Sequence, residues 1–506
     1  MNSQRCRAAP GGTGATTLPQ RLPTCPALRS VASAGQGATM SRPDCAPARV
    51  DAAVGLALRR ALGDAGPVDP GRPLRAVVGL SGGCDSMLLL DAVARLAAPL
   101  PISVAAVHVH HGLSPHADDW AAFCRAEAAA RGVAICVEHV EVARRGGHSL
   151  EAVAREARYA AFARCGADVL LLAHHADDQA ETLLLQLLRG AGAHGLAAMA
   201  AVRPATATQP AIVRPLLAFP RVELVAAARD RGLRWIDDES NADTRLRRNY
   251  LRHVVLPAIE SGFPGCPETL VRAAAHQAEA ARLIDELAAA DAATALSTDP
   301  VDGPTLDRSQ LGTLAHTRPH RARNLLRWFL RQHALRPPST RRLDEMMNQL
   351  TRAAVDARIA IAHDGWVLGV HRGRIHVHAP AQPWAARRWH GEGALELPHG
   401  RMVFASAEPD AFRALSGAGL ALELRPRLRG ERLRRAATPP SVSVASRLQQ
   451  DGVPHWRRDN WPLVCCNGVP VAVPAAGSDT RISAGAGAPE IVVRWIPHPR
   501  RLGGKD

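Results

Sequence analysis

Short apolar runs alternate with amphipathic segments between about residues 73 and 189, and this alternation constrains the fold more than any other feature of the chain. The apolar runs at 75–80, 102–109, 134–142 and 168–173 predict strands, and a helical pattern follows each of them. Strands that alternate with helices predict an α/β domain with a doubly wound parallel sheet. Ligands of such sheets bind beyond the carboxyl ends of the strands, so the residues that follow each strand are the first site candidates.

A glycine-containing loop joins the first predicted strand to a helix at 87–98. It consists of Ser81, Gly82, Gly83, Cys84, Asp85 and Ser86. The glycines permit a tight turn, and the free N–H groups at the start of the helix would face a bound anion. Asp85 would repel phosphate by itself, but it makes sense as a ligand of Mg²⁺ that bridges phosphate oxygens. The alternative is an ordinary capped helix with an aspartate in its first turn.

Lysine is almost missing from the sequence, since Lys505 is the only one among 62 basic residues. A Walker A loop needs a lysine beside Ser or Thr to reach the β- and γ-phosphates, so that class is excluded. Schiff-base chemistry on an internal lysine is excluded as well. Any phosphate site must therefore use backbone N–H groups and arginines.

The net charge of +15 predicts a polyanionic partner, with nucleic acid as the first candidate and a merely arginine-rich composition as the alternative. No apolar run is long enough to span a membrane. The ten cysteines form no C-x-x-C pair, which favours a reducing, cytoplasmic location. Residues 1–43 contain no acidic residue and resemble a transit peptide in composition; an unstructured extension, or a start site misplaced upstream of Met40, is the alternative. We expect this segment to be disordered.

Four further polar motifs lie after the phosphate loop. The histidine-rich segment 108–120 brings His111 to the end of the second strand; a zinc site is the weaker alternative, because its histidines alternate across a strand. In the segment 154–162, Arg155 and Arg158 share one helical face. A solvated arginine pair is the alternative there.

Acidic residues gather after the fourth strand, in His174-His175-Ala176-Asp177-Asp178-Gln179-Ala180-Glu181. Asp178 and Glu181 are three apart on a helix and favour a metal or amine site over simple helix-dipole complementation. The segment 237–257 contributes Arg248, Asn249 and Arg252, which could contact triphosphate or RNA, or could form a structural capping loop.

The loop at 81–86 resembles the PP-loop ATP pyrophosphatases, which cleave ATP between its α- and β-phosphates. Taken in order, the motifs SGGCDS, HHGL, AREARY, HHADDQAET with LLRGAGAHGL, RPLL and DDESNADTRLRRNYLR resemble the bacterial tRNA(Ile)-lysidine synthase family over about residues 73–260. The tail segment 447–464 is similar to the C-terminal domain of that family.

The resemblance implies ligation of free L-lysine to C2 of the wobble cytidine of a tRNA(Ile) with a CAU anticodon. It implies ATP and Mg²⁺, an adenylated cytidine intermediate, and a switch from Met to Ile decoding. Under this hypothesis Asp85 and Asp178 bind the metal, and Asp178 and Glu181 alternatively deprotonate the ammonium group. Arg155 and Arg248 stabilise charge that develops on phosphate. His111 and the loop residues 81–86 bind ATP.

The domains that we expect are a disordered extension (1–50), the PP-loop domain (51–262), a mainly helical tRNA-binding domain (263–380) and a small α+β tRNA-binding domain (381–506). Arg158, Asn249, Arg252, Arg323 and Arg327 are the predicted tRNA contacts, and Arg331 and the arginine-rich stretch 425–435 extend the basic surface. Each of these basic clusters could instead be a solvated face. The sequence does not predict the oligomeric state.

Three other functions are compatible with parts of the pattern. A tRNA thiolase of the same fold would generally need reactive or cluster-binding cysteines, and Cys84 is the only cysteine in the phosphate loop. A glutamine-dependent synthetase would need an ammonia-producing domain, which is not recognisable. A non-catalytic RNA-binding protein would not need Asp85, Asp178 and Arg248.

Overall fold

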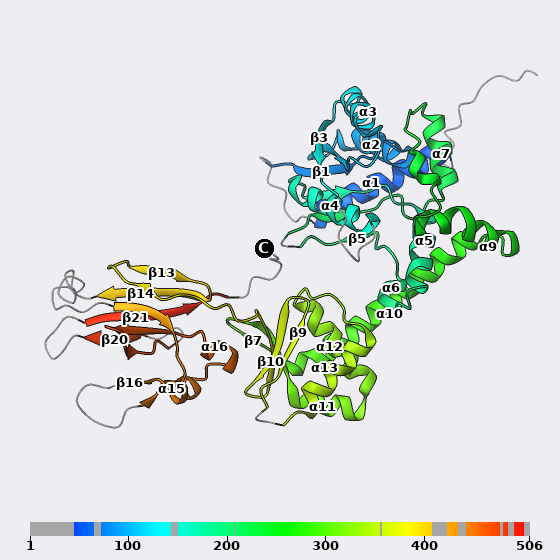
Figure 1. Ribbon diagram of the computed structural model, residues 1–506. Helices are drawn as coiled ribbons and strands as arrows, with labels where there is room; N and C mark the ends of the chain where they lie inside the picture. Colours follow the sequence, from blue (N-terminus) through cyan, green and yellow to red (C-terminus); the bar gives the residue numbers. More distant parts are fainter. Residues whose placement is uncertain are drawn as a thin grey trace, which may run out of the picture. The chain divides into compact units, whose positions relative to one another are not determined.

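The computed structural model describes residues 45–64, 72–142, 150–206, 208–354, 357–406, 422–433, 442–475, 479–483 and 490–499 (Figure 1). The expected disorder of residues 1–43 lies outside this part of the chain. Helix α1 (Ala46–Asp64) begins inside the extension that we expected at 1–50, because Val50, Val54 and Leu58 give it an apolar face that packs against the next domain.

A six-stranded sheet forms the centre of the first domain, in the order β3-β2-β1-β4-β6-β5. Strands β1, β2, β3, β4 and β6 are parallel, which confirms the predicted doubly wound sheet, and β5 adds an antiparallel edge. The strands are β1 (Leu74–Gly79), β2 (Ile102–His110), β3 (Ala134–His139), β4 (Val169–Leu171), β5 (Val202–Arg203) and β6 (Ala211–Val213).

Helices cover both faces of this sheet. One face packs against α1, α2, α3 and α7 around residues such as Leu88 and Leu224, and the other packs against α4 through Phe162. The helices are α2 (Cys84–Ala97), α3 (Ala117–Ala130), α4 (Leu150–Arg164), α5 (Ala176–Leu187), α6 (Ala193–Leu196), α7 (Arg221–Asp230), α8 (Arg247–Tyr250) and α9 (Leu256–Gly262), with a 3-10 turn η1 (Glu239–Ala242) and a π-helical turn η2 (Leu251–Val255).

The middle region combines helices with a sheet ordered β7-β8-β11-β10-β9. Its helices are α10 (Cys266–Ala295), α11 (Arg308–Thr317), α12 (Pro319–Gln332) and α13 (Thr340–Arg352), and its strands are β7 (Leu296–Asp299), β8 (Gly303–Asp307), β9 (Ala360–His363), β10 (Trp366–His371) and β11 (Arg374–His378). Tight turns join β9 to β10 and β10 to β11, and Asp364, Gly365, Arg372 and Gly373 all have the positive φ that such hairpin turns require. Strands β7 and β8 were not predicted.

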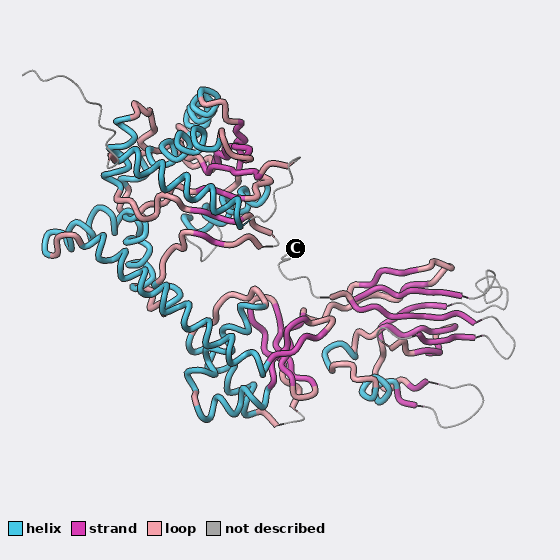
Figure 2. Tube along the Cα trace, turned by 180° about the vertical axis from the view of Figure 1, so that it is seen from behind, coloured by secondary structure: helices cyan, strands magenta, loops and turns pink. Residues whose placement is uncertain are grey.

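Two four-stranded antiparallel sheets form the C-terminal region, β12-β15-β18-β19 and β13-β14-β21-β20, and Figure 2 shows how strands dominate it. They share a core that includes Trp461 and Trp495. The elements are β12 (Arg387–Arg388), β13 (Ala394–Leu397), β14 (Gly400–Ser406), β15 (Leu422–Pro426), β16 (Arg432–Leu433), β17 (Val442–Ser443), α15 (Val444–Gln450), α16 (His455–Arg458), β18 (Pro462–Cys466), β19 (Val469–Ala472), β20 (Asp479–Ser483) and β21 (Glu490–Pro497). Within the described ranges, no helix has the length and apolar character that a membrane crossing requires.

Candidate active site

The predicted phosphate loop lies between β1 and α2, at the carboxyl edge of the sheet. The Ser81 and Ser86 hydroxyls are 3.1 Å apart, and the Ser86 hydroxyl donates to the Gly83 carbonyl at 2.9 Å. The first N–H groups of α2 have no partner within the helix, so they are free to bind an anion. The geometry supports the predicted phosphate-binding role of residues 81–86.

Gly82 cannot be replaced without moving its surroundings. Its φ is +88°, and a Cβ atom would lie 2.7 Å from the side chain of Ile236 and 3.2 Å from Cys124 Sγ. The Ile236 N–H donates to the Gly82 carbonyl at 2.9 Å, which fixes the loop against the segment after α7. The sequence pattern did not predict this role of Ile236, because the two residues are far apart along the chain.

Asp85 lies at the start of α2 and faces His175. The His175 Nε2 atom is 3.7 Å from Asp85 Oδ2 and 3.6 Å from Asp178 Oδ2. Burial raises the pKa of Asp85, and the nearby charge of His175 only partly opposes this effect. Asp85 Oδ1 is buried without a hydrogen-bond partner among the described residues. A buried carboxylate oxygen of this kind fits a bound cation such as Mg²⁺.

Asp178 and Glu181 bind two arginines that reach them from the end of the domain. Arg248 donates to Glu181 at 2.6 Å and to Asp178 at 2.8 Å, and Arg252 donates to the same carboxylates at 2.6 and 3.3 Å. Glu181 is fully buried. Burial opposes ionisation of Asp178, but His175 and Arg248 outweigh it and lower the pKa of this group. The structure therefore joins two motifs that lie about 70 residues apart.

This arrangement bears on the metal-binding prediction for Asp178. Its Oδ2 accepts from the His175 N–H at 3.1 Å, and its Oδ1 accepts from both arginines. A carboxylate offers about four lone-pair sites, so about one remains for a cation or an ammonium group. Each carboxylate oxygen of Glu181 accepts from one arginine, Arg248 or Arg252, and this geometry suits holding the arginines better than removing a proton.

His111 and Arg158 meet at the end of β2. Arg158 Nε donates to His111 Nε2 at 3.4 Å, and burial together with the charge of Arg158 lowers the pKa of His111 to about 4. The neutral ring consequently carries its proton on Nδ1, which is buried and has no partner among the described residues. That N–H is available as a donor to a nucleotide. Arg155 instead lies over the ring of Tyr159, with 5.0 Å between its guanidinium carbon and the ring centroid.

Asn249 was also a candidate for binding, as were the histidines of segment 108–120 as a metal site, but neither forms an open binding site among the described residues. Asn249 is buried, and its amide donates to the Asp243 carbonyl at 3.1 Å, so it braces the loop before α8. The histidines of segment 108–120 do not form a group of metal donors in the described structure, where only Asp299, Asp302 and His376 come close enough together. Asp302 already pairs with His376 and Arg457, so this group resembles a structural ion cluster.

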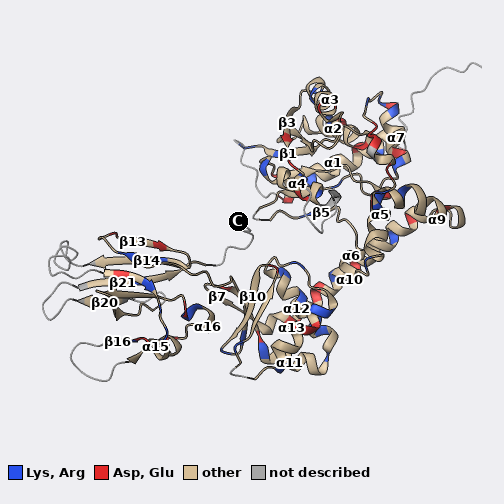
Figure 3. Cartoon of the chain, viewed as in Figure 1, with Lys and Arg blue, Asp and Glu red and all other residues tan. Residues whose placement is uncertain are grey.

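The basic residues Arg323, Arg327 and Arg331 of the middle region are four residues apart along α12, and Figure 3 marks the basic and acidic residues of this region by colour. Arg323 pairs with Asp344 at 2.7 Å, and Arg331 pairs with Asp285. Burial, and then the charge of Arg323, lower the pKa of Arg327. Within the protein, acidic groups thus compensate part of this basic surface.

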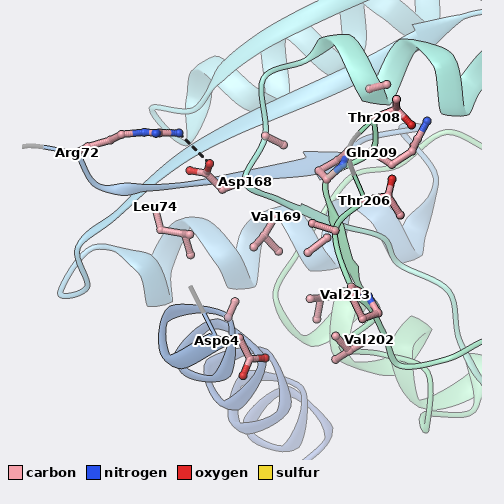
Figure 4. A pocket seen from close by; sticks show the side chains of 17 residues that line it. Asp64, Arg72, Leu74, Asp168, Val169, Val202, Thr206, Thr208, Gln209 and Val213 are labelled. Atoms are coloured by element: carbon pink, nitrogen blue, oxygen red, sulfur yellow. Dashed lines mark hydrogen bonds and ion pairs between the residues drawn. The ribbon is translucent and has the colours of Figure 1, made fainter. Parts of the chain in front are cut away.

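A cavity of about 1100 Å³ lies at the opposite edge of the PP-loop domain (Figure 4). Its walls include Leu74, Val169 and Ala211, at the amino ends of β1, β4 and β6, and the ion pair between Arg72 and Asp168 lies beside it. The phosphate loop is at the carboxyl ends of the strands, so this cavity is separate from the site described above.

The parallel sheet and the strand–SGGCDS–helix turn define a PP-loop ATP-binding domain. A family described as "PP-loop domain" matches residues 66–259, "TilS substrate binding domain" matches 310–376, and "TilS substrate C-terminal domain" matches 422–495. The chain belongs to the tRNA(Ile)-lysidine synthase family, which confirms the predicted family. It is 39% identical over 425 residues to the tRNA(Ile)-lysidine synthase of Azoarcus sp. (strain BH72), covering 84% of this chain and 92% of that protein.

Two further relatives have the same name. The protein of Nitrosomonas europaea is 38% identical over 84% of this chain and 92% of its own length. The protein of Alkalilimnicola ehrlichii is 41% identical over 81% of this chain and 91% of its own length. The similarity therefore extends well beyond the PP-loop domain.

Cys84, in the phosphate loop, is predicted to be unreactive toward alkylating reagents. Burial, and then the charge of Asp85, raise the pKa of Cys84 to about 12, so its thiolate is scarcely populated near neutral pH. We expect iodoacetamide at pH 8 to leave Cys84 unmodified while it alkylates the exposed Cys45, as read by peptide mass spectrometry. Rapid alkylation of Cys84 in the folded protein would contradict this and would favour thiol chemistry in the loop.

Proposed function

We propose that the protein ligates L-lysine to C2 of the wobble cytidine of a cytoplasmic tRNA(Ile) with a CAU anticodon. The observation that carries the proposal is the convergence of the phosphate loop, Asp85 and the Asp178–Arg248 pair at one edge of the sheet, in a chain of this family. This edge offers anion donors, a site for a cation and carboxylates that attract an amine.

The C2 oxygen of cytidine is a poor leaving group and has to be activated first. O2 attacks the α-phosphate of ATP, which forms an adenylated cytidine and releases pyrophosphate. Residues 81–86 would hold the phosphates, and His111 and Arg248 would donate to the nucleotide. Mg²⁺, held by Asp85 with the remaining site of Asp178, would neutralise phosphate charge.

The ε-amine of lysine then attacks C2 and expels AMP. Asp178 has a lowered pKa and stays ionised, so it attracts the incoming ammonium group but is a weak base. Arg248 and Arg252, fixed by Glu181, would stabilise the charge on the departing phosphate. The product would carry lysidine and would decode isoleucine codons in place of methionine codons.

The direct test is incubation with ATP, Mg²⁺, labelled lysine and a CAU-anticodon tRNA(Ile) transcript. We expect label on the tRNA and stoichiometric release of AMP and pyrophosphate. A transcript with the anticodon changed to GAU is the matched control and should remain unlabelled. Absence of label, with the protein folded and tRNA bound, would reject the proposal.

A further inference from the structure

Three arginines surround Tyr159, which lies in the second half of α4. The guanidinium carbons of Arg155 and Arg203 lie 5.0 and 5.5 Å from the centroid of its ring. Burial, together with Arg203 and Arg155, lowers the pKa of Arg214, and a side-chain hydrogen bond with Tyr159 opposes this shift only in part. We refer to Arg155, Arg203, Arg214 and Tyr159 as the arginine–tyrosine cluster.

The positive charge of this cluster is not compensated by the described residues around it. Arg214, only 6% exposed, donates to His174 Nδ1 at 3.3 Å and to the Ala200 carbonyl at 2.7 Å. Burial lowers the pKa of His174 to about 3, so this partner is neutral.

Arg203 is less well satisfied. Its Nε and Nη2 atoms are buried and have no hydrogen-bond partner among the described residues. By contrast, Arg248 and Arg252 share two carboxylates. Buried guanidinium N–H groups that lack an acceptor and lie beside like charges are costly, and a bound anion would remove that cost.

The cluster is on the substrate side of the sheet. Arg214 follows β6 directly, and His174 comes three residues after β4, which pairs with both β1 and β6. Strands are about 4.8 Å apart, so β6 lies roughly 10 Å from the strand that leads into the phosphate loop. A ligand of the phosphate loop and a ligand of the cluster would be neighbours.

We propose that the arginine–tyrosine cluster is a second phosphate-binding subsite, separate from the loop at 81–86. Guanidinium forks match the oxygens of a phosphate group, and the Tyr159 ring holds two of them in place. The phosphate comes either from the backbone of the bound RNA or from the pyrophosphate that ATP releases. This assignment rests on the proposed function for its choice of substrates.

The test compares Arg203→Gln and Arg203→Lys with Arg60→Gln. Arg60 is an exposed arginine of α1, which covers the other face of the sheet, so its variant is the control for the loss of one charge. One arm measures the affinity for the tRNA(Ile) transcript at several salt concentrations. The other arm measures the affinity for inorganic pyrophosphate by calorimetry.

We expect Arg203→Gln to lower the affinity for one of the two ligands, tRNA or pyrophosphate, about tenfold. Arg203→Lys should restore part of that affinity. If the ligand is an RNA phosphate, the plot of log affinity for tRNA against log salt concentration should also become less steep by about 1. If only the affinity for pyrophosphate falls, the subsite binds the pyrophosphate that ATP releases. The Tm should stay level or rise, because a buried unpartnered charge is removed.

Unchanged affinity for both ligands, relative to Arg60→Gln, would overturn the subsite. So would a clear fall in Tm of Arg203→Gln with no rescue of binding by Arg203→Lys, because that pattern marks a structural role. Both arms measure binding in the absence of lysine. A wild-type protein that binds in this way but fails to incorporate lysine would refute the proposed function and leave the subsite standing.

Discussion

Replacing Asp85 with asparagine is expected to lower kcat/KM for lysine transfer to tRNA about 100- to 1000-fold, the loss typical when one preorganised electrostatic group is removed. The asparagine keeps the shape of the side chain but loses the negative charge that would hold a cation beside the phosphates. Labelled lysine incorporation at subsaturating tRNA measures the effect. Asp118→Asn is the matched control, because it removes the negative charge of a side chain that is 93% exposed.

The same substitution should not destabilise the fold. Burial raises the pKa of Asp85 above 3.8, so the native state binds its proton more tightly than the unfolded state does. The free energy of unfolding of the wild type therefore falls as pH rises from about 4 through the native pKa. Asp85→Asn lacks this pH dependence. Normal activity of the variant, or a large loss of Tm, would contradict the role given to Asp85.

The elements that could be predicted from the sequence depend on local patterns. The four apolar runs and the helical patterns after them predicted β1 to β4 and the helices that follow these strands. The turns at Asp364-Gly365 and Arg372-Gly373 follow from local backbone preferences. The phosphate loop was likewise visible, because its glycines and serines are contiguous.

What the sequence could not predict depends on contacts between distant residues. Strand β5 has two residues and no periodicity, and the surface that the apolar face of α1 covers is known only from the folded sheet. The union of Glu181 with Arg248 and Arg252 joins positions 67 and 71 residues apart. Arg203 ends β5 and Arg214 directly follows β6, and only the sheet order brings the two residues to Tyr159. The position of Arg214 directly after a short apolar run was the one available signal.

Replacing Glu181 with alanine is expected to cost about 3–5 kcal/mol of unfolding free energy, the usual loss when one partner of a buried ion pair is removed. Glu181 is fully buried and accepts from Arg248 and Arg252 at 2.6 Å each, so its removal leaves two partly buried guanidinium groups with only Asp178 to compensate them. A domain of this size should lose roughly 6–20 °C in Tm, measured by calorimetry or circular dichroism.

Two matched variants separate burial from charge. Asp344→Ala breaks the pair with Arg323, whose side chains are 41% and 40% exposed, and it should cost at most about 1 kcal/mol. A quadruple variant with Asp178→Asn, Glu181→Leu, Arg248→Met and Arg252→Met removes all four charges of the cluster, and it should recover much of the stability while activity stays lost. A Tm for Glu181→Ala equal to that of Asp344→Ala would show that water or rearrangement compensates the two arginines. The conclusion that Glu181 fixes Arg248 and Arg252 for catalysis would then be wrong.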